Sequence, residues 1–122
     1  MIAELIMRLF HARTNAHVLH LGVSGQGSFA AHKALNEFYD GIVDIADSLA
    51  EGYQGEHDLI DFSGKCAYRH NGNALKMVSE LKEWIEANRY EAVEAEDTFL
   101  HNVIDEAVQL CSTTIYKLKF LR

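Results

Sequence analysis

Apolar residues recur every three or four positions along four stretches of this chain, with charged residues between them. This spacing puts the apolar side chains on one face of an α-helix. It predicts helices over residues 2–23, 29–53, 74–89 and 95–121. The apolar positions that define them are, in chain order, Ile2, Leu5, Ile6, Leu9, Ala16, Leu19 and Val23; Phe29, Leu35, Phe38, Ile42, Ala46, Leu49 and Tyr53; Leu75, Val78, Leu81 and Ile85; and Phe99, Val103, Ala107, Leu110, Thr114, Leu118 and Leu121.

The predicted connections differ in length. In the first, "SGQG", Gly25 and Gly27 allow the positive φ angles of a helix end, and Ser28 offers an N-cap for the next helix. The second, "QGEHDLIDFSGKCAYRHNGN", is a longer segment in which we expect one short helical turn over Leu59 to Phe62. The chain has no proline to interrupt a helix and no strand pattern. The sequence therefore predicts an all-α, antiparallel four-helix bundle in a single domain over residues 1–122.

Composition and charge narrow the classes of function. With 122 residues, 48% of them hydrophobic, the chain has the size of one ordinary domain. The formal net charge is −7 and the basic residues are scattered, which argues against DNA as the main partner. Glu4 and Arg8 interrupt the apolar start, so we expect neither a cleaved leader nor a membrane span. Cys66 and Cys111 form no CxxC pair and favour free thiols in the cytoplasm, with one disulfide as the alternative.

Four side chains of two kinds are candidate metal ligands. Asp47 and Glu51 are four positions apart on one helix and share a face, and Asp44 lies one turn before Asp47. His20 and His32 flank the first turn, where antiparallel packing of the two helices brings them near each other. Asp47 lies fifteen residues beyond His32, so roughly 22 Å of helix separates them at about 1.5 Å per residue. These histidines and carboxylates therefore cannot bind one ion within a single chain.

Two copies of the chain could bring them together. If their first two helices pack antiparallel around a two-fold axis, the start of one second helix lies beside the end of the other. Each of two symmetric sites would then receive His20 and His32 from one subunit and Asp47 and Glu51 from its partner. Imidazole and carboxylate together suit iron, zinc or manganese better than calcium or copper. The competing interpretation is a pair of structural histidines and a solvated acidic face.

The run "HLGVSGQGSFAAHKALNEFYDGIVDIADSLAE", residues 20–51, resembles the signature of the Dps-type mini-ferritins, ferritin-like proteins of starved and oxidatively stressed bacteria. The matching positions are His20, His32, Asp47 and Glu51, with Gly25 and Phe29 where that turn usually has a glycine and an aromatic residue. The resemblance implies a ferritin-like bundle and an intersubunit centre that oxidises Fe(II) with peroxide or dioxygen. It also implies iron storage in a hollow, dodecameric shell, a homo-oligomer built from two-fold dimers.

The sequence departs from this family at several points. Asn36 stands where the family often has a further acidic residue, although its amide could still bind a metal-bound water or hydrogen-bond a ligand carboxylate. Leu21 replaces a frequent tryptophan. The chain is also shorter than typical members and has no lysine-rich N-terminal extension. The missing acid at Asn36 favours the alternative function, a non-catalytic ferritin-like assembly or binding module, for example a phage-encoded one, that keeps at most a structural metal; the retained set of four ligands opposes it.

Other residues have weaker claims to a role. His17 lies one turn before His20 and is a candidate extra ligand or a surface residue. Tyr39 and Trp84 are candidates for a redox-active aromatic near iron, with ordinary packing as the alternative. An intrasubunit di-iron centre needs a Glu-x-x-His pair on a helix, and the sequence has none. We assign no role to the remaining histidines, which are His11, His57, His70 and His101.

Overall fold

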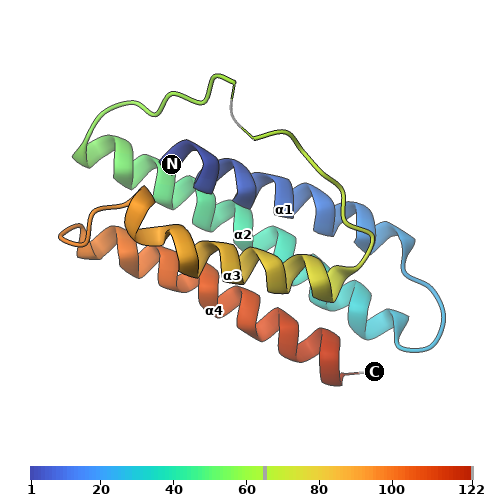
Figure 1. The fold of residues 1–122 in the computed structure, drawn as a ribbon. Helices are drawn as coiled ribbons and strands as arrows, with labels where there is room; N and C mark the ends of the chain where they lie inside the picture. Colours follow the sequence, from blue (N-terminus) through green and yellow to red (C-terminus); the bar gives the residue numbers. More distant parts are fainter. Residues whose placement is uncertain (65, 122) are drawn as a thin grey trace.

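Four α-helices make up the secondary structure of this computed structural model, which describes residues 1–64 and 66–121 (Figure 1). They are α1 (Ile2–Gly22), α2 (Ser28–Glu56), α3 (Ala74–Ala92) and α4 (Thr98–Phe120). The described residues contain no strand, so the predicted all-α class is confirmed. Within the same residues, none of the helices has the length and apolar character that crossing a membrane requires.

The helix ends differ from the predictions by a few residues. Gly27, with a φ of 81°, occupies the N-cap position of α2 that we assigned to Ser28, and no side chain caps this end. The α3 helix continues to Ala92, three residues past the predicted end, where Ala92 and Val93 are buried. The α4 helix begins at Thr98 rather than at residue 95. The backbone amide of Asp97 donates to the carbonyl of Glu94, so the residues just before α4 form a turn instead of its first helical residues.

The short helical turn expected over Leu59 to Phe62 is wrong, because these residues are not helical. Nearby side chains accept the backbone amide protons instead. Asp58 accepts from the amide of Leu59 at 2.7 Å, and Gln54 accepts from the amide of Ile60 at 3.0 Å. Side chains of this kind compete with helical carbonyls for backbone donors, and here they keep the start of the connection extended.

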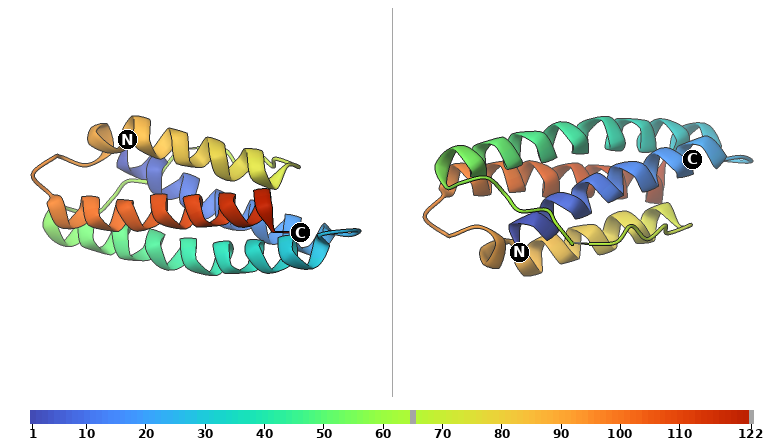
Figure 2. Two further views of the ribbon diagram at one scale, coloured as in Figure 1. Left: turned by 90° about the horizontal axis from the view of Figure 1, so that it is seen from below. Right: turned by 90° about the horizontal axis from the view of Figure 1, so that it is seen from above.

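The four helices form one bundle in which every neighbouring pair runs antiparallel (Figures 1 and 2). The α1 helix packs against α2 and α3, and α4 packs against the same two helices. The two short connections, residues 23–27 and 93–97, join α1 to α2 and α3 to α4. Residues 57–73 connect α2 to α3, and we call this segment the crossover. Its described residues, 57–64 and 66–73, run back along the bundle, so that α2 and α3 point the same way on one diagonal.

The core confirms most of the predicted apolar faces. Phe38, Leu5, Leu9 and Ile42 are fully buried between the helices, but the predicted core positions Phe29 and Phe99 are 78% and 48% exposed. Both phenylalanines lie in the first turn of a helix, Phe29 in α2 and Phe99 in α4. The remaining large side chains that are fully buried are Ile6, Leu35, Leu49, Val78, Ile85, Val93, Leu100 and Ile104.

A buried asparagine fastens the crossover to the bundle. The side chain of Asn15, only 2% exposed, donates to the backbone carbonyl of Asn71 and accepts from the amide of the same residue, at 2.9 and 2.8 Å. These two bonds hold the end of the crossover against α1 just before α3 begins.

Candidate functional site

His20 and His32 meet at the end of the bundle where α1 turns into α2. His20 lies in the last turns of α1 and is 8% exposed, whereas His32 lies in the second turn of α2 and is exposed. Their imidazole rings are stacked, with ring centres 3.6 Å apart and planes 28° from parallel. The prediction that the antiparallel pairing of α1 and α2 brings these two histidines together is confirmed.

Two reciprocal hydrogen bonds fix which nitrogen of each ring acts as a donor to the protein. Nδ1 of His20 lies 3.0 Å from the backbone carbonyl oxygen of His32, and Nδ1 of His32 lies 3.0 Å from that of His20. A carbonyl oxygen only accepts, so each Nδ1 is the donor, and Nε2 is the ring nitrogen left for a ligand. No hydrogen bond from a described residue reaches either Nε2 atom. Among the described residues, no fully buried side-chain nitrogen or oxygen lacks a hydrogen-bond partner, so the unpartnered Nε2 of His20 is not completely sealed from solvent.

Two further side chains, His17 and Tyr39, contact His20, and Tyr39 connects the pair to Asn36 and Asp40. The Tyr39 ring stacks on His17, with ring centres 4.3 Å apart, and meets the edge of His20 at 5.3 Å. The Tyr39 hydroxyl donates to the side-chain oxygen of Asn36 at 2.7 Å, and the Asn36 amide donates to Asp40 at 3.2 Å. Asn36 is therefore held by its neighbours. The role of Asp40 was not predicted, although its spacing of four residues from Asn36 is a recognisable helical pair.

The predicted carboxylate ligands lie farther along α2. Asp44, Asp47 and Glu51 are all exposed, and no hydrogen bond or ion pair from a described residue reaches them. His20 lies on α1 and His32 near the start of α2, whereas these carboxylates lie farther along the same continuous α2 helix, so one chain does not bring the two groups together. Within one chain, the described residues contain no group of three or more histidine, cysteine, aspartate or glutamate side chains that could hold a metal ion.

The histidines without an assigned role have partners elsewhere in the bundle. His57, just after α2, donates from Nε2 to the buried carboxylate of Asp97 at 2.7 Å, and this bond raises the pKa of His57. His101, on α4, donates from Nε2 to the Val93 carbonyl and accepts at Nδ1 from Arg89. Both nitrogens of His101 are used within the protein, which marks it as a structural residue.

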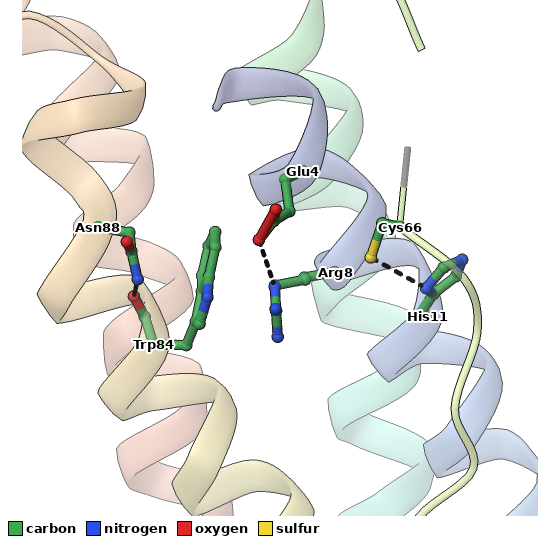
Figure 3. A network of polar contacts seen from close by, with 6 residues as sticks. All are labelled: Glu4, Arg8, His11, Cys66, Trp84 and Asn88. Carbon is green, nitrogen blue, oxygen red and sulfur yellow. Dashed lines mark hydrogen bonds and ion pairs between the residues drawn. The ribbon is translucent and has the colours of Figure 1, made fainter. Parts of the chain in front are cut away.

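The cysteines and Trp84 lie away from the histidine pair. Cys66 and Cys111 are both free, and burial raises the pKa of the Cys111 thiol to about 12. Trp84 lines a cleft of about 980 Å³ between α1 and α3, where the Arg8 guanidinium carbon lies 4.3 Å from the indole ring centre (Figure 3). None of the residues around the histidine pair lines this cleft. Of the two aromatic residues suggested for a redox role, only Tyr39 contacts the histidines.

No curated protein and no solved structure matches this chain. A family model matches residues 25–118, which include α2, the crossover, α3 and most of α4, while His20 and the rest of α1 lie before the matched segment. The chain therefore belongs to a family of unknown function, DUF5856.

Proposed function

We propose that this protein is a ferritin-like, Dps-like iron-binding homo-oligomer that oxidises Fe(II) between two subunits and sequesters the ferric product. In the proposed dimer, His20 and His32 of one subunit face Asp47 and Glu51 of the partner subunit, so that the two-fold axis relates two identical sites. Iron is the substrate, and peroxide or dioxygen is the oxidant.

The main support for the proposal is the hydrogen bonding of the histidine pair, in which the protein uses Nδ1 of each ring and leaves Nε2 without a partner among the described residues. Histidine ligands of metals usually donate their other ring nitrogen to a carbonyl or carboxylate, which fixes the tautomer and the ring orientation. His20 and His32 both do so through Nδ1. The two rings are held against each other, with centres 3.6 Å apart, and no hydrogen bond from a described residue reaches either Nε2 atom.

The exposed acidic residues of α2 supply the complementary half. Asp47 and Glu51 have no partner among the described residues, and they lie one turn apart near the end of α2. Two carboxylates and two neutral imidazoles carry a total charge of −2, which balances one divalent ion. Anionic oxygen ligands favour Fe(III) over Fe(II), so the carboxylates would draw the equilibrium toward the oxidised ion.

The connectivity of the helices also supports a ferritin-like assignment. Ferritin-like bundles differ from simple up-and-down bundles by a single long crossover connection. Here residues 57–73 provide one such connection, between the two helical hairpins.

The oxidation itself balances when the solvent supplies the protons. Each Fe(II) gives up one electron, and one peroxide accepts two electrons and two protons to form two water molecules. Two ferrous ions are therefore oxidised for each peroxide consumed. His20 and His32 bind the ions through neutral nitrogen, and the partner's carboxylates hold the ferric product until it leaves the site.

Anaerobic Fe(II) loading followed by peroxide tests the chemistry directly. We expect a fast rise of ferric absorbance for the natural protein and its loss in Asp47→Ala. The matched control is Glu106→Ala, which removes an exposed carboxylate from α4, outside the proposed site. Oxidation no faster than that of iron in buffer, by a protein that still dimerises, would reject the enzymatic function.

Mixed dimers test whether the site lies between subunits. One variant lacks both histidines (His20→Ala with His32→Ala), and the other lacks both carboxylates (Asp47→Ala with Glu51→Ala). Each alone should be inactive. After mixing and subunit exchange, each mixed dimer would contain one complete site and one site without any ligand, so activity should return. Failure to recover activity in verified mixed dimers would exclude a shared site.

A second candidate function is a non-catalytic helical assembly module with at most a structural metal. The observation that favours it is Asn36, whose side chain is held by Tyr39 and Asp40 and which supplies no third carboxylate. This candidate predicts stable binding of zinc or manganese at the same four residues without accelerated oxidation of iron. Comparing metal affinity with oxidation rate in the same preparation separates the two functions.

A further inference from the structure

Three of the most exposed large apolar side chains lie at the two ends of α2. Leu21 and Phe29, which are 74% and 78% exposed, flank the turn before α2, and Leu59, which is 80% exposed, lies just after its end. Solvent-exposed leucine and phenylalanine residues occur singly on most proteins, but here two lie together before α2 and a third, the most exposed of the three, lies just after it.

The local structure explains why Leu59 faces outward. Its amide donates to the side chain of Asp58, and the amide of the next residue, Ile60, donates to Gln54. The Ile60 side chain packs against the hydrophobic core. In an extended segment, successive side chains point to opposite sides, so Leu59 is directed away from the bundle.

The pairing proposed above for the iron site sets a register that relates the two ends. We place His32 opposite the middle of the segment between the partner's Asp47 and the partner's Glu51. Distances along the two antiparallel helices can then be measured from this one point. Phe29 is then about 5 Å from the site along one helix, and the partner's helix ends about 10 Å from it in the same direction, at about 1.5 Å per residue. The partner's crossover therefore begins beside the turn that presents Leu21 and Phe29.

We propose that Leu59 of each subunit packs over Leu21 and Phe29 of a second copy of this chain, so that two apolar contacts close the outer sides of the two histidine sites. This interaction surface rests on the proposed two-fold pairing and adds to it a contact that involves no metal ligand. The partner is a second copy of this chain because the antiparallel alignment of the two α2 helices places Leu59 of each subunit beside Leu21 and Phe29 of the other. The same contact therefore occurs twice, as a two-fold symmetric interface requires. Burial of these side chains excludes water beside His20 and His32.

Site-directed cross-linking tests this contact. The test protein carries Leu21→Cys and Leu59→Cys together with Cys66→Ser, and it is treated with a short bifunctional maleimide. Cys111 stays in place because it is fully buried and its pKa is raised to about 12. Within one chain, the 29 residues of α2 separate the two positions by about 40 Å. A product between positions 21 and 59 must therefore join two chains.

We expect a covalent dimer from the double-cysteine protein and little from Leu21→Cys or Leu59→Cys alone, since like positions lie at opposite ends of the dimer. A protein that stays monomeric, a dimer that does not cross-link, or equal products from the single variants would overturn the proposal. The reaction needs no iron, so a cross-linked dimer without iron oxidation rejects only the proposed enzymatic function. Iron oxidation at an intersubunit site without the cross-link rejects only this contact.

A second measurement does not depend on introduced thiols. Leu59→Ser should raise the concentration at which the dimer dissociates at least severalfold in analytical ultracentrifugation. The control is Phe120→Ser, which changes a side chain that is 66% exposed on α4. Equal dissociation of the two variants would count against the contact.

Discussion

His20 and His101 are both buried histidines on helices of the same bundle, yet they use their nitrogens differently. His101 donates from Nε2 to the Val93 carbonyl and accepts from Arg89 at Nδ1, and its ring stacks on Tyr90. His20 satisfies only Nδ1, and its Nε2 remains open. The first arrangement completes a structural network. The second leaves one nitrogen available to a ligand from outside the chain.

The difference shows that burial alone does not separate a structural histidine from a candidate ligand. Exposed fractions of 8% and 7% make His20 and His101 indistinguishable by that measure. The number of ring nitrogens that the protein itself satisfies does separate them. Variants at and around the two histidines therefore test whether this distinction holds.

The largest effect should come from His20→Asn. The asparagine amide can replace Nδ1 as a donor to the His32 carbonyl, but it provides no lone pair in place of Nε2. Loss of a residue that only orients a metal ligand typically lowers activity roughly 10–100-fold. Because His20 is itself a proposed ligand, we expect the rate of iron oxidation to fall by more than this. Stopped-flow absorbance with peroxide measures this loss, and an unchanged melting temperature would show that the fold is retained. Full activity in this variant would remove His20 from the site.

For His101→Ala we expect a loss of stability with no loss of iron oxidation. This change leaves the Val93 carbonyl and one Arg89 donor without a partner and opens a cavity beside Tyr90. The free energy of unfolding should drop by about 2–4 kcal/mol in urea titrations. Iron oxidation per folded protein should not change, because the His20 and His32 rings are untouched. A selective loss of oxidation with normal stability would contradict the structural role of His101.

A smaller effect should follow Tyr39→Phe. The ring remains against His17 and His20, and only the hydrogen bond to Asn36 is lost. We expect stability to fall by about 1 kcal/mol, with iron binding retained. The informative measurement is the oxidation rate at saturating iron. A slow rate with normal iron affinity would assign the Tyr39 hydroxyl a redox role instead of a packing role.

The smallest effect should be the pH dependence at His57. The hydrogen bond to Asp97 raises the pKa of His57 above its ordinary value of 6.5 in the folded state. Protonated His57 therefore stabilises the fold fully below about pH 6.5, and this contribution is lost as the pH rises through the raised pKa. His57→Gln keeps a donor without the charge, so the natural protein should exceed it in stability at low pH and approach it at high pH. Thermal unfolding over this range measures the difference, and a gap that widens with pH would contradict the assignment.

Much of the fold could be predicted from the sequence because helix periodicity is a local signal. Leu5, Phe38 and Ile85 each belong to a series of apolar residues at helical spacing, one series on each of three helices, and all three are fully buried. Phe29 shows where this signal fails. It belongs to the predicted apolar face, but its burial depends on whether another part of the protein packs against it. That depends on tertiary and intersubunit contacts, which the spacing of residues in one helix does not contain. The misplaced turn at Leu59 has a comparable cause, since side-chain acceptors replaced helical carbonyls there.

The candidate site divides in the same way. The meeting of His20 and His32 could be predicted, because a short turn between antiparallel helices brings their ends together. The reciprocal bonds to the two carbonyls could not, since they depend on rotamers at both positions. The position of Asp47 relative to the histidines of another subunit depends on an interface, and the sequence of a single chain contains only its ligand types and spacing.

The crossover has a consequence for how the chain acquires its fold. The α1–α2 and α3–α4 hairpins each close through connections of five residues, whereas 17 residues separate one hairpin from the other. Closing a loop costs entropy that grows only slowly with its length, so the long connection adds little penalty to docking. We expect each hairpin to form early and their association to limit the folding rate. A chain cut within the crossover should then reassemble from two separately expressed halves, a split protein whose complementation reports hairpin docking.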